Sequence, residues 1–292
     1  KADIFYKRTI KPHTPVTSVD TASEALAVSM GEKARVDMDY MCELTGKTEE
    51  EIFADLKGVI FLNPMHGYGN STQAKYLMAD EYLSGNVREK LVLARKSAEL
   101  YPEDYTVNVE ALELVQPKDL TASEIAVRLG ATWLPTEIVE QFMFEFLGTP
   151  RYAQWNIKVH FSAYTGEWNI EGKSYDRSNV KAYSTYGTGR INAYKIIEET
   201  LNLKDVRIFD YVEDADGKKK AVLNKKETAI AQAKQELIKQ GFQDWVWSDP
   251  ERRERLCRLY NDKFNSLRPR EYDGSHIVFS GMNPEIELRE HQ

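Results

Sequence analysis

The sequence predicts an α+β fold, in which a helical N-terminal body is followed by a small antiparallel sheet with flanking helices. Three observations support this fold class: capping signals recur through the first half, hairpin-like alternation begins after Pro150, and two long helical patterns come near the end. The change near Pro150 predicts two domains, over residues 1–150 and 151–292. An apolar content of 42% is ordinary for globular protein.

Capping boxes predict where helices begin in the first half. In each, a Thr is followed three residues later by a Glu, so the two side chains can satisfy free amides of a helix N-terminus. The boxes begin at Thr21, Thr48 and Thr121. Apolar residues at helical spacing predict further helices over 37–44, from Asn86 to Leu100 and after Pro135, and 59–62 is a candidate strand.

Hairpins and helices alternate in the second half. Residues 155–172 alternate around Thr165 and Gly166, which predicts a hairpin with Trp155, Ile157, Val159 and Phe161 on one face. A second hairpin is expected from 206–212 and 220–223, after a helix over 193–203. The last two helical patterns, over 230–245 and from Pro250, are expected to form an antiparallel pair.

Charge is distributed unevenly along the chain. The formal net charge is −7. Residues 1–150 carry 15 Lys and Arg against 24 Asp and Glu, whereas residues 151–292 carry 24 against 22. A polyanion such as DNA is therefore expected to meet the second half of the chain.

Arginines of the second half are the candidate DNA contacts. Arg255 and Arg258 lie opposite the apolar stripe of the last helical pattern, and Arg268 and Arg270 follow it. Arg190 ends a Gly-Thr-Gly-Arg segment before the helix at 193–203, where backbone amides and an Arg can bind phosphate. The alternatives are a solvated face of mixed charge and a flexible turn.

Two further patterns admit a nucleic-acid interpretation. Residues 37–57 have the spacing of a helix–turn–helix, but Glu49, Glu50 and Glu51 begin the second helix and would repel phosphates, which favours a structural helix pair. Aromatic residues are dense from 152 to 194. Exposed aromatic side chains can stack single-stranded bases, although a packed core gives the same pattern and is the favoured interpretation.

The sequence contains no complete catalytic site. No phosphate-binding loop, nucleophile elbow or metal-ligand spacing of histidines occurs in it. Cys42 and Cys257 lie in apolar helical patterns and are expected to be buried free thiols. No apolar run is long enough to span a bilayer. Because the chain begins with Lys1 and has no leader pattern, we expect an internal piece of a larger cytoplasmic protein.

Several stretches resemble the middle of very large bacterial proteins of mobile elements and phages, which join an adenine-specific DNA methyltransferase to a Swi/Snf-type helicase. The segments that carry the resemblance are 82–91, 108–112, 124–133, 261–265, 268–276 and 284–292. The final segment is similar to the entry of a Swi/Snf-type motor. There the family's Gln helps to hold adenine, which makes Gln292 a possible adenine contact in the full-length parent.

The resemblance implies a setting as well as neighbouring domains. The parent protein is expected to use ATP with Mg and S-adenosylmethionine in its adjacent helicase and methyltransferase domains, within the bacterial cytoplasm. A role in a conjugative transposon or in restriction–modification would fit such a parent. No cofactor is expected in the chain itself.

These observations lead to an expected function. The chain is expected to be a non-catalytic connector that contacts DNA within a methyltransferase–helicase. The alternatives are a purely structural spacer or protein-interaction module without nucleic-acid contact, and an independent enzyme. A steep salt dependence of DNA binding distinguishes the first two, because phosphate contacts release counterions.

Overall fold

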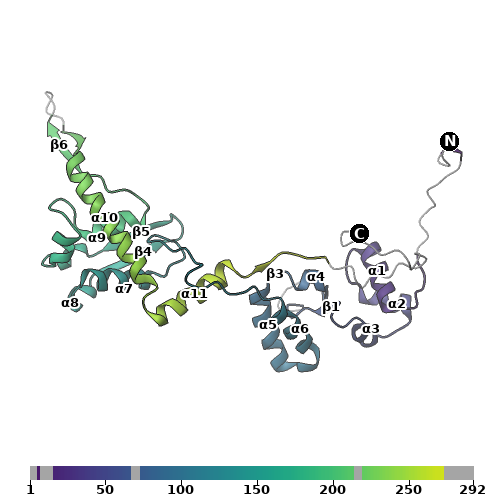
Figure 1. Cartoon of the computed structure of the whole chain (residues 1–292). Coiled ribbons are helices and arrows are strands. Elements are labelled where there is room, and N and C mark those ends of the chain that lie inside the picture. Colours follow the sequence, from purple (N-terminus) through teal and green to yellow (C-terminus); the bar gives the residue numbers. More distant parts are fainter. Residues whose placement is uncertain (1–4, 7–15, 67–72, 214–218, 273–292) are drawn as a thin grey trace. The chain divides into compact units, whose positions relative to one another are not determined.

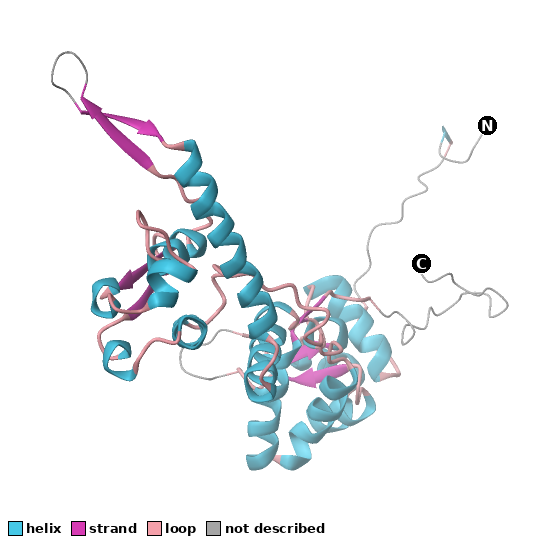
Figure 2. Ribbon diagram, turned by 60° about the vertical axis from the view of Figure 1, so that its left-hand side comes forward, coloured by secondary structure: helices cyan, strands magenta, loops and turns pink. Residues whose placement is uncertain are grey.

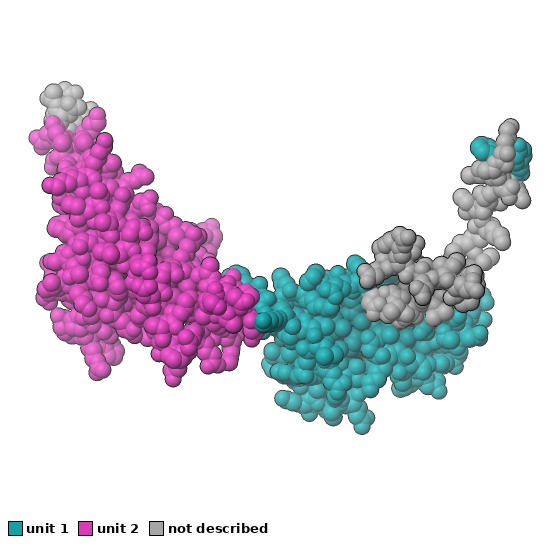
Figure 3. Space-filling model, in the orientation of Figure 1, with its two compact units in different colours: residues 1–118, 264–292 teal, residues 119–263 magenta. Residues whose placement is uncertain are grey.

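The computed structural model describes residues 5–6, 16–66, 73–213 and 219–272. The chain divides into two compact units (Figure 3). Unit 1 comprises residues 1–118 and 264–292, and unit 2 comprises residues 119–263. Helices and small two-stranded antiparallel sheets make up both units, which confirms the predicted α+β class.

Unit 1 begins with three helices and a hairpin. The helices are α1 (Ala22–Lys33), α2 (Met38–Thr45) and α3 (Glu49–Asp55) (Figure 1). The strands β1 (Ile60–Leu62) and β2 (Tyr76–Met78) pair antiparallel. Leu26, Met41, Ile52 and Ile60 come together from the three helices and β1 in one buried cluster. The capping boxes predicted at Thr21 and Thr48 both form and begin α1 and α3.

A second helical layer completes unit 1. It contains α4 (Ala79–Tyr82), β3 (Gly85–Asn86), α5 (Val87–Leu100) and α6 (Pro102–Leu114). Strand β8 (Leu267–Arg268) pairs antiparallel with β3, and the Val87 amide donates to the Ser266 carbonyl at 3.1 Å. This pairing returns the C-terminal segment to unit 1. The domain predicted over 151–292 is therefore divided between the two units.

Unit 2 is built from helices and two separate hairpins. Its elements are α7 (Thr136–Leu147), α8 (Arg151–Gln154), β4 (Lys158–Ser162), β5 (Glu167–Glu171), the 3-10 helix η2 (Lys173–Asp176), the π-helical segment η3 (Lys181–Thr185), α9 (Ala193–Leu201), β6 (Phe209–Glu213), β7 (Lys219–Leu223), α10 (Lys225–Val246) and α11 (Pro250–Phe264). Both predicted hairpins form, as β4–β5 and β6–β7. The position of Pro150 lies inside this unit, where it precedes α8.

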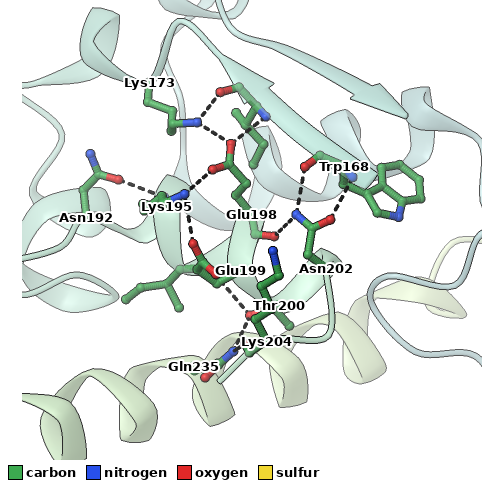
Figure 4. A network of polar contacts seen from close by, with 12 residues as sticks. Trp168, Lys173, Asn192, Lys195, Glu198, Glu199, Thr200, Asn202, Lys204 and Gln235 are labelled. Carbon is green, nitrogen blue, oxygen red and sulfur yellow. Dashed lines mark hydrogen bonds and ion pairs between the residues drawn. The ribbon is translucent and has the colours of Figure 1, made fainter. Parts of the chain in front are cut away.

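A polar network ties α9 to β5 inside unit 2 (Figure 4). The buried Glu198 carboxylate accepts hydrogen bonds from the Ile170 amide at 2.8 Å and from Lys195 Nζ at 2.5 Å, and it is also ion-paired with Lys173. Asn202 adds hydrogen bonds with both the amide and the carbonyl of Trp168, at 2.9 and 2.8 Å. Burial raises the pKa of Glu198, but these donors outweigh it, so the pKa lies below its ordinary value.

The structure corrects three local predictions. Thr121 and Glu124 bond to each other, but no helix follows, because Ile125, Val127 and Leu129 are buried at a spacing of two. Trp155 is 81% exposed and does not share the buried face of β4. In the described part of the chain α10 and α11 meet near the turn that joins them and do not pack along their lengths.

Cys42 and Cys257 are free thiols, as expected, but both are only partly buried rather than buried.

Candidate nucleic-acid interface

Helices α2 and α3 form the helix–turn–helix that the sequence suggested. Asp37 caps α2, and Gly46 ends it in the left-handed conformation with a φ of 68°. The capping box of Thr48 then begins α3 at once, so the turn between the helices is tight. In the order α1, α2, α3, β1, β2, the helix α3 has the position from which a reading helix would enter a DNA groove.

The acidic start of α3 is partly used inside unit 1. The Glu49 carboxylate accepts from Lys75 Nζ and from the Tyr76 hydroxyl, both at 2.6 Å, and these hydrogen bonds lower the pKa of Glu49. Burial and the same carboxylate raise the pKa of Tyr76. Glu51 accepts from the Thr48 amide at 2.9 Å as part of the capping box. Two of the three carboxylates are therefore structural; the capping box predicted the role of Glu51, but the sequence did not reveal that of Glu49.

The remaining charge of this segment still opposes contact with phosphates. Residues 18–73 carry four Lys and Arg against ten Asp and Glu, and α3 itself contains neither Lys nor Arg. Lys47, just before α3, is ion-paired with Asp55 at 2.6 Å. A reading helix ordinarily presents cations or amides to DNA. Helix α3 is consequently a poor reader of duplex DNA.

Arg190 anchors a hairpin of unit 2. Its guanidinium is ion-paired with Asp210 at 2.8 Å and donates to the Phe209 carbonyl at 2.9 Å. Together with Asn224, the N-cap of α10, it lowers the pKa of Asp210. Arg190 thus fixes the base of the β6–β7 hairpin, which extends past the start of α10 (Figure 2). Its charge is already partnered.

Arg268 and Arg270 tie the C-terminal segment to unit 1. Arg268 donates to the Leu83 carbonyl at 3.0 Å and is ion-paired with Glu271 at 2.6 Å. Arg270 is ion-paired with Asp80 at 2.7 Å. Both side chains therefore support the β3–β8 pairing, and they lie in a different unit from Arg255 and Arg258.

Arg255 and Arg258 lie on the exposed face of α11, as predicted. Arg258 is ion-paired with Glu254 at 3.0 Å, with both side chains more than 70% exposed. Arg255 makes no ion pair within the described residues. The two arginines line a groove of about 440 Å³ with Leu259; its other lining residues are Pro135, Glu251, Glu254 and Asp262. This face has mixed charge, with Arg255 as its unpartnered cation.

The neighbouring Arg252 has a structural role that the sequence did not reveal. It is buried, and its guanidinium lies 3.5 Å from the centre of the Trp245 ring. It also donates to the carbonyls of Trp245 and Val246, at 2.6 and 3.1 Å, and so satisfies the C-terminus of α10. Of the four arginines of α11, Arg252 is thus internal, whereas Arg253, Arg255 and Arg258 are exposed.

The dense aromatic residues of 152–194 divide between core and surface. Trp168 and Tyr194 are buried, as the favoured interpretation predicts. Tyr152, Trp155 and Tyr175 are at least 60% exposed. The core interpretation is therefore confirmed for the buried residues, and base stacking by the exposed ones stays a prediction.

Gln292 lies outside the described residues, as does all of 273–292. Across the described ranges there is no group of three or more His, Cys, Asp or Glu side chains placed to hold a metal ion. No helix among the residues that the structure describes has the length and apolar character needed to cross a membrane.

Comparison with known families matches both units. Residues 18–73 match a family profile described as "Probable helicase, winged helix domain", which covers α1 to β1. Residues 128–266 match a profile described as a domain of unknown function (DUF8437), which covers most of unit 2. No curated protein and no solved structure gives a significant match. The first match relates the chain to helicases and makes contact with DNA a possibility for it.

Proposed function

We propose that the chain is a non-catalytic connector of a helicase-related protein and that it contacts duplex DNA through α11. The observation that carries the proposal is the helicase winged-helix match over a segment that folds as three helices and the strand β1. The sequence resemblance extends the proposal to a parent in which a methyltransferase uses S-adenosylmethionine and a Swi/Snf-type motor uses ATP with Mg, in the bacterial cytoplasm.

The distribution of charge supports a contact on unit 2 rather than on the winged-helix segment. The segment 18–73 is strongly acidic, and α3 has no cation to offer a phosphate. Arg190, Arg268 and Arg270 are held by Asp210, Glu271 and Asp80. Among the five predicted arginines, Arg255 and Arg258 are the two on an exposed helix face. The acidic winged-helix segment favours the competing function, a spacer without DNA contact.

Replacing Arg255 and Arg258 together by Gln tests the duplex contact. Each phosphate contact contributes about 0.9 to the slope of log affinity against log salt. We expect the double variant to lower that slope by about 1.8, with no change in sequence preference. Fluorescence anisotropy with a labelled 20-base-pair duplex, titrated at several salt concentrations, measures it.

A matched control removes the same charge elsewhere. Lys57 and Lys96 are exposed in unit 1 and form no ion pair within the described residues. The Lys57→Gln/Lys96→Gln variant is expected to keep the wild-type salt slope. A wild-type chain that fails to bind duplex, or equal slopes for all three proteins, would leave the spacer as the function.

The chain alone is expected to hydrolyse no ATP and to transfer no methyl group to DNA. The reason is that its sequence has no nucleotide-binding loop and no complete methyltransferase motif. Phosphate release and transfer of a labelled methyl group from S-adenosylmethionine measure the two activities. Turnover well above that of a blank purification would refute the non-catalytic assignment.

A further inference from the structure

Three exposed aromatic residues of unit 2 come from α8, its C-terminal end and η2. The exposed fraction is 62% for Tyr152, 81% for Trp155 and 60% for Tyr175. Tyr152 lies in α8, Trp155 directly follows α8, and Tyr175 lies in η2. Aromatic side chains of this size usually bury most of their surface, so a group of them left in solvent indicates a binding surface.

Direct contacts hold these residues in one neighbourhood. The Asn156 side chain donates to the Tyr152 carbonyl at 3.1 Å. A Cβ added to Gly172 would lie 2.0 Å from the Asn156 carbonyl oxygen, so the two backbones touch. The Tyr175 amide then donates to the Gly172 carbonyl at 2.9 Å. The chain of contacts therefore runs from α8 through Asn156, the residue after Trp155, to η2.

Cations accompany the aromatic residues. Arg151, Arg177 and Lys181 are all exposed, and none of them forms an ion pair within the described residues. Arg151 and Arg177 are sequence neighbours of this group. Lys181 belongs to it because its Nζ lies 3.8 Å from a Cβ built on Gly148, three residues before Arg151. The neighbouring Asp176 is buried, where it accepts from the Tyr194 hydroxyl at 2.6 Å. It therefore presents no charge to the surface.

We infer that this surface binds single-stranded DNA. We call it the aromatic platform and define it as Tyr152, Trp155 and Tyr175 with Arg151, Arg177 and Lys181. Unpaired bases expose flat faces that stack on Trp and Tyr rings, while cations meet the phosphates between them. Duplex DNA keeps its bases stacked on one another, so the platform favours single strands. The inference deepens the proposed function, since it rests on DNA contact by unit 2.

Replacing Trp155 by Ala tests the stacking. We expect about a tenfold loss of affinity for a fluorescein-labelled 12-mer of thymidine, the usual cost of one lost base–aromatic stack. Trp155→Phe, which keeps a ring, is expected to retain most of the affinity. Tyr164→Ala is the matched control, because Tyr164 is 99% exposed in the β4–β5 turn and lies outside the platform. Its affinity is expected to equal that of the wild type.

Salt dependence tests the cations of the same surface. Single strands give a slope of about 0.7 per phosphate contact, so three cations predict a slope of about 2. The Arg151→Gln/Arg177→Gln/Lys181→Gln variant is expected to lose most of it. All six side chains are exposed, so the variants are expected to have the same urea midpoint of unfolding as the wild type. This measurement separates a loss of binding from a loss of folding.

Failure of this inference is distinct from failure of the duplex contact. Single-strand binding that depends on Trp155 supports the platform, even where Arg255→Gln/Arg258→Gln leaves duplex binding unchanged. The inference is overturned if the wild type binds no single strand or if Trp155→Ala and Tyr164→Ala bind equally. It is also overturned if the platform variants lose a protein partner but keep single-strand affinity.

Discussion

Gly172→Ala is expected to destabilise unit 2 by about 3 kcal/mol, whereas Gly166→Ala is expected to cost about 1 kcal/mol. Both glycines have a left-handed φ, 72° and 71° respectively, so both variants pay the same backbone strain. A Cβ on Gly166 meets nothing within 4 Å, but one on Gly172 would lie 2.0 Å from the Asn156 carbonyl oxygen. The difference between the variants isolates that collision.

Tryptophan fluorescence reports on this unit alone. The five tryptophans of the chain all lie between Trp133 and Trp247, inside unit 2. Urea unfolding followed by fluorescence therefore gives the free energy of unfolding of unit 2 for each glycine variant. If Gly166→Ala and Gly172→Ala lose the same free energy of unfolding, the carbonyl of Asn156 does not collide with a Cβ at position 172.

Local signals predicted the elements that local chemistry decides. Thr48 and Glu51 form their capping box because both partners lie within one helical turn. The same motif at Thr121 did not start a helix, because burial of Ile125, Val127 and Leu129 in the core requires extended chain. Tertiary packing overrode the capping signal there, and no feature of the motif itself distinguishes the two outcomes.

The boundary between the two units depends on a strand pairing that the sequence pattern does not predict. Leu267 and Arg268 pair with Asn86 and Gly85, about 180 residues earlier in the chain. Two-residue strands have too little alternation to predict a partner. The sequence pattern changes from helical to alternating near Pro150, but this point separates α7 from the β4–β5 hairpin within one core.

The sequence indicated which residues could contact DNA, but not which of them already have structural partners. Arg190 and Arg255 look alike in sequence, yet Asp210 holds the first, whereas the second has no ion-pair partner among the described residues. Trp155 was expected to be buried with β4, but α8 ends at Gln154 and the strand begins only at Lys158. Which aromatic side chains stay exposed follows from these element ends.

Glu198→Gln is expected to destabilise unit 2 by about 2 kcal/mol at pH 7. Loss of one partner of a buried ion pair costs about 3–5 kcal/mol, and partial exposure of Lys173 and Lys195 reduces this. Glu199→Gln is the matched control, since Glu199 shares Lys195 but is less buried and does not accept from β5. Its cost is expected to stay below about 1 kcal/mol.

The effect of Glu198→Gln should also depend on pH. The folded pKa of Glu198 lies below its ordinary value of 4.5, because the donors from Lys173, Lys195 and Ile170 outweigh burial. The carboxylate therefore contributes its full stability above pH 4.5 and loses it as the pH falls through the folded pKa. Urea unfolding at pH 7 and at steps below pH 4.5 should show the difference between wild type and Glu198→Gln shrinking with acid. A difference that stays constant would mean that the carboxylate charge does not hold α9 to β5.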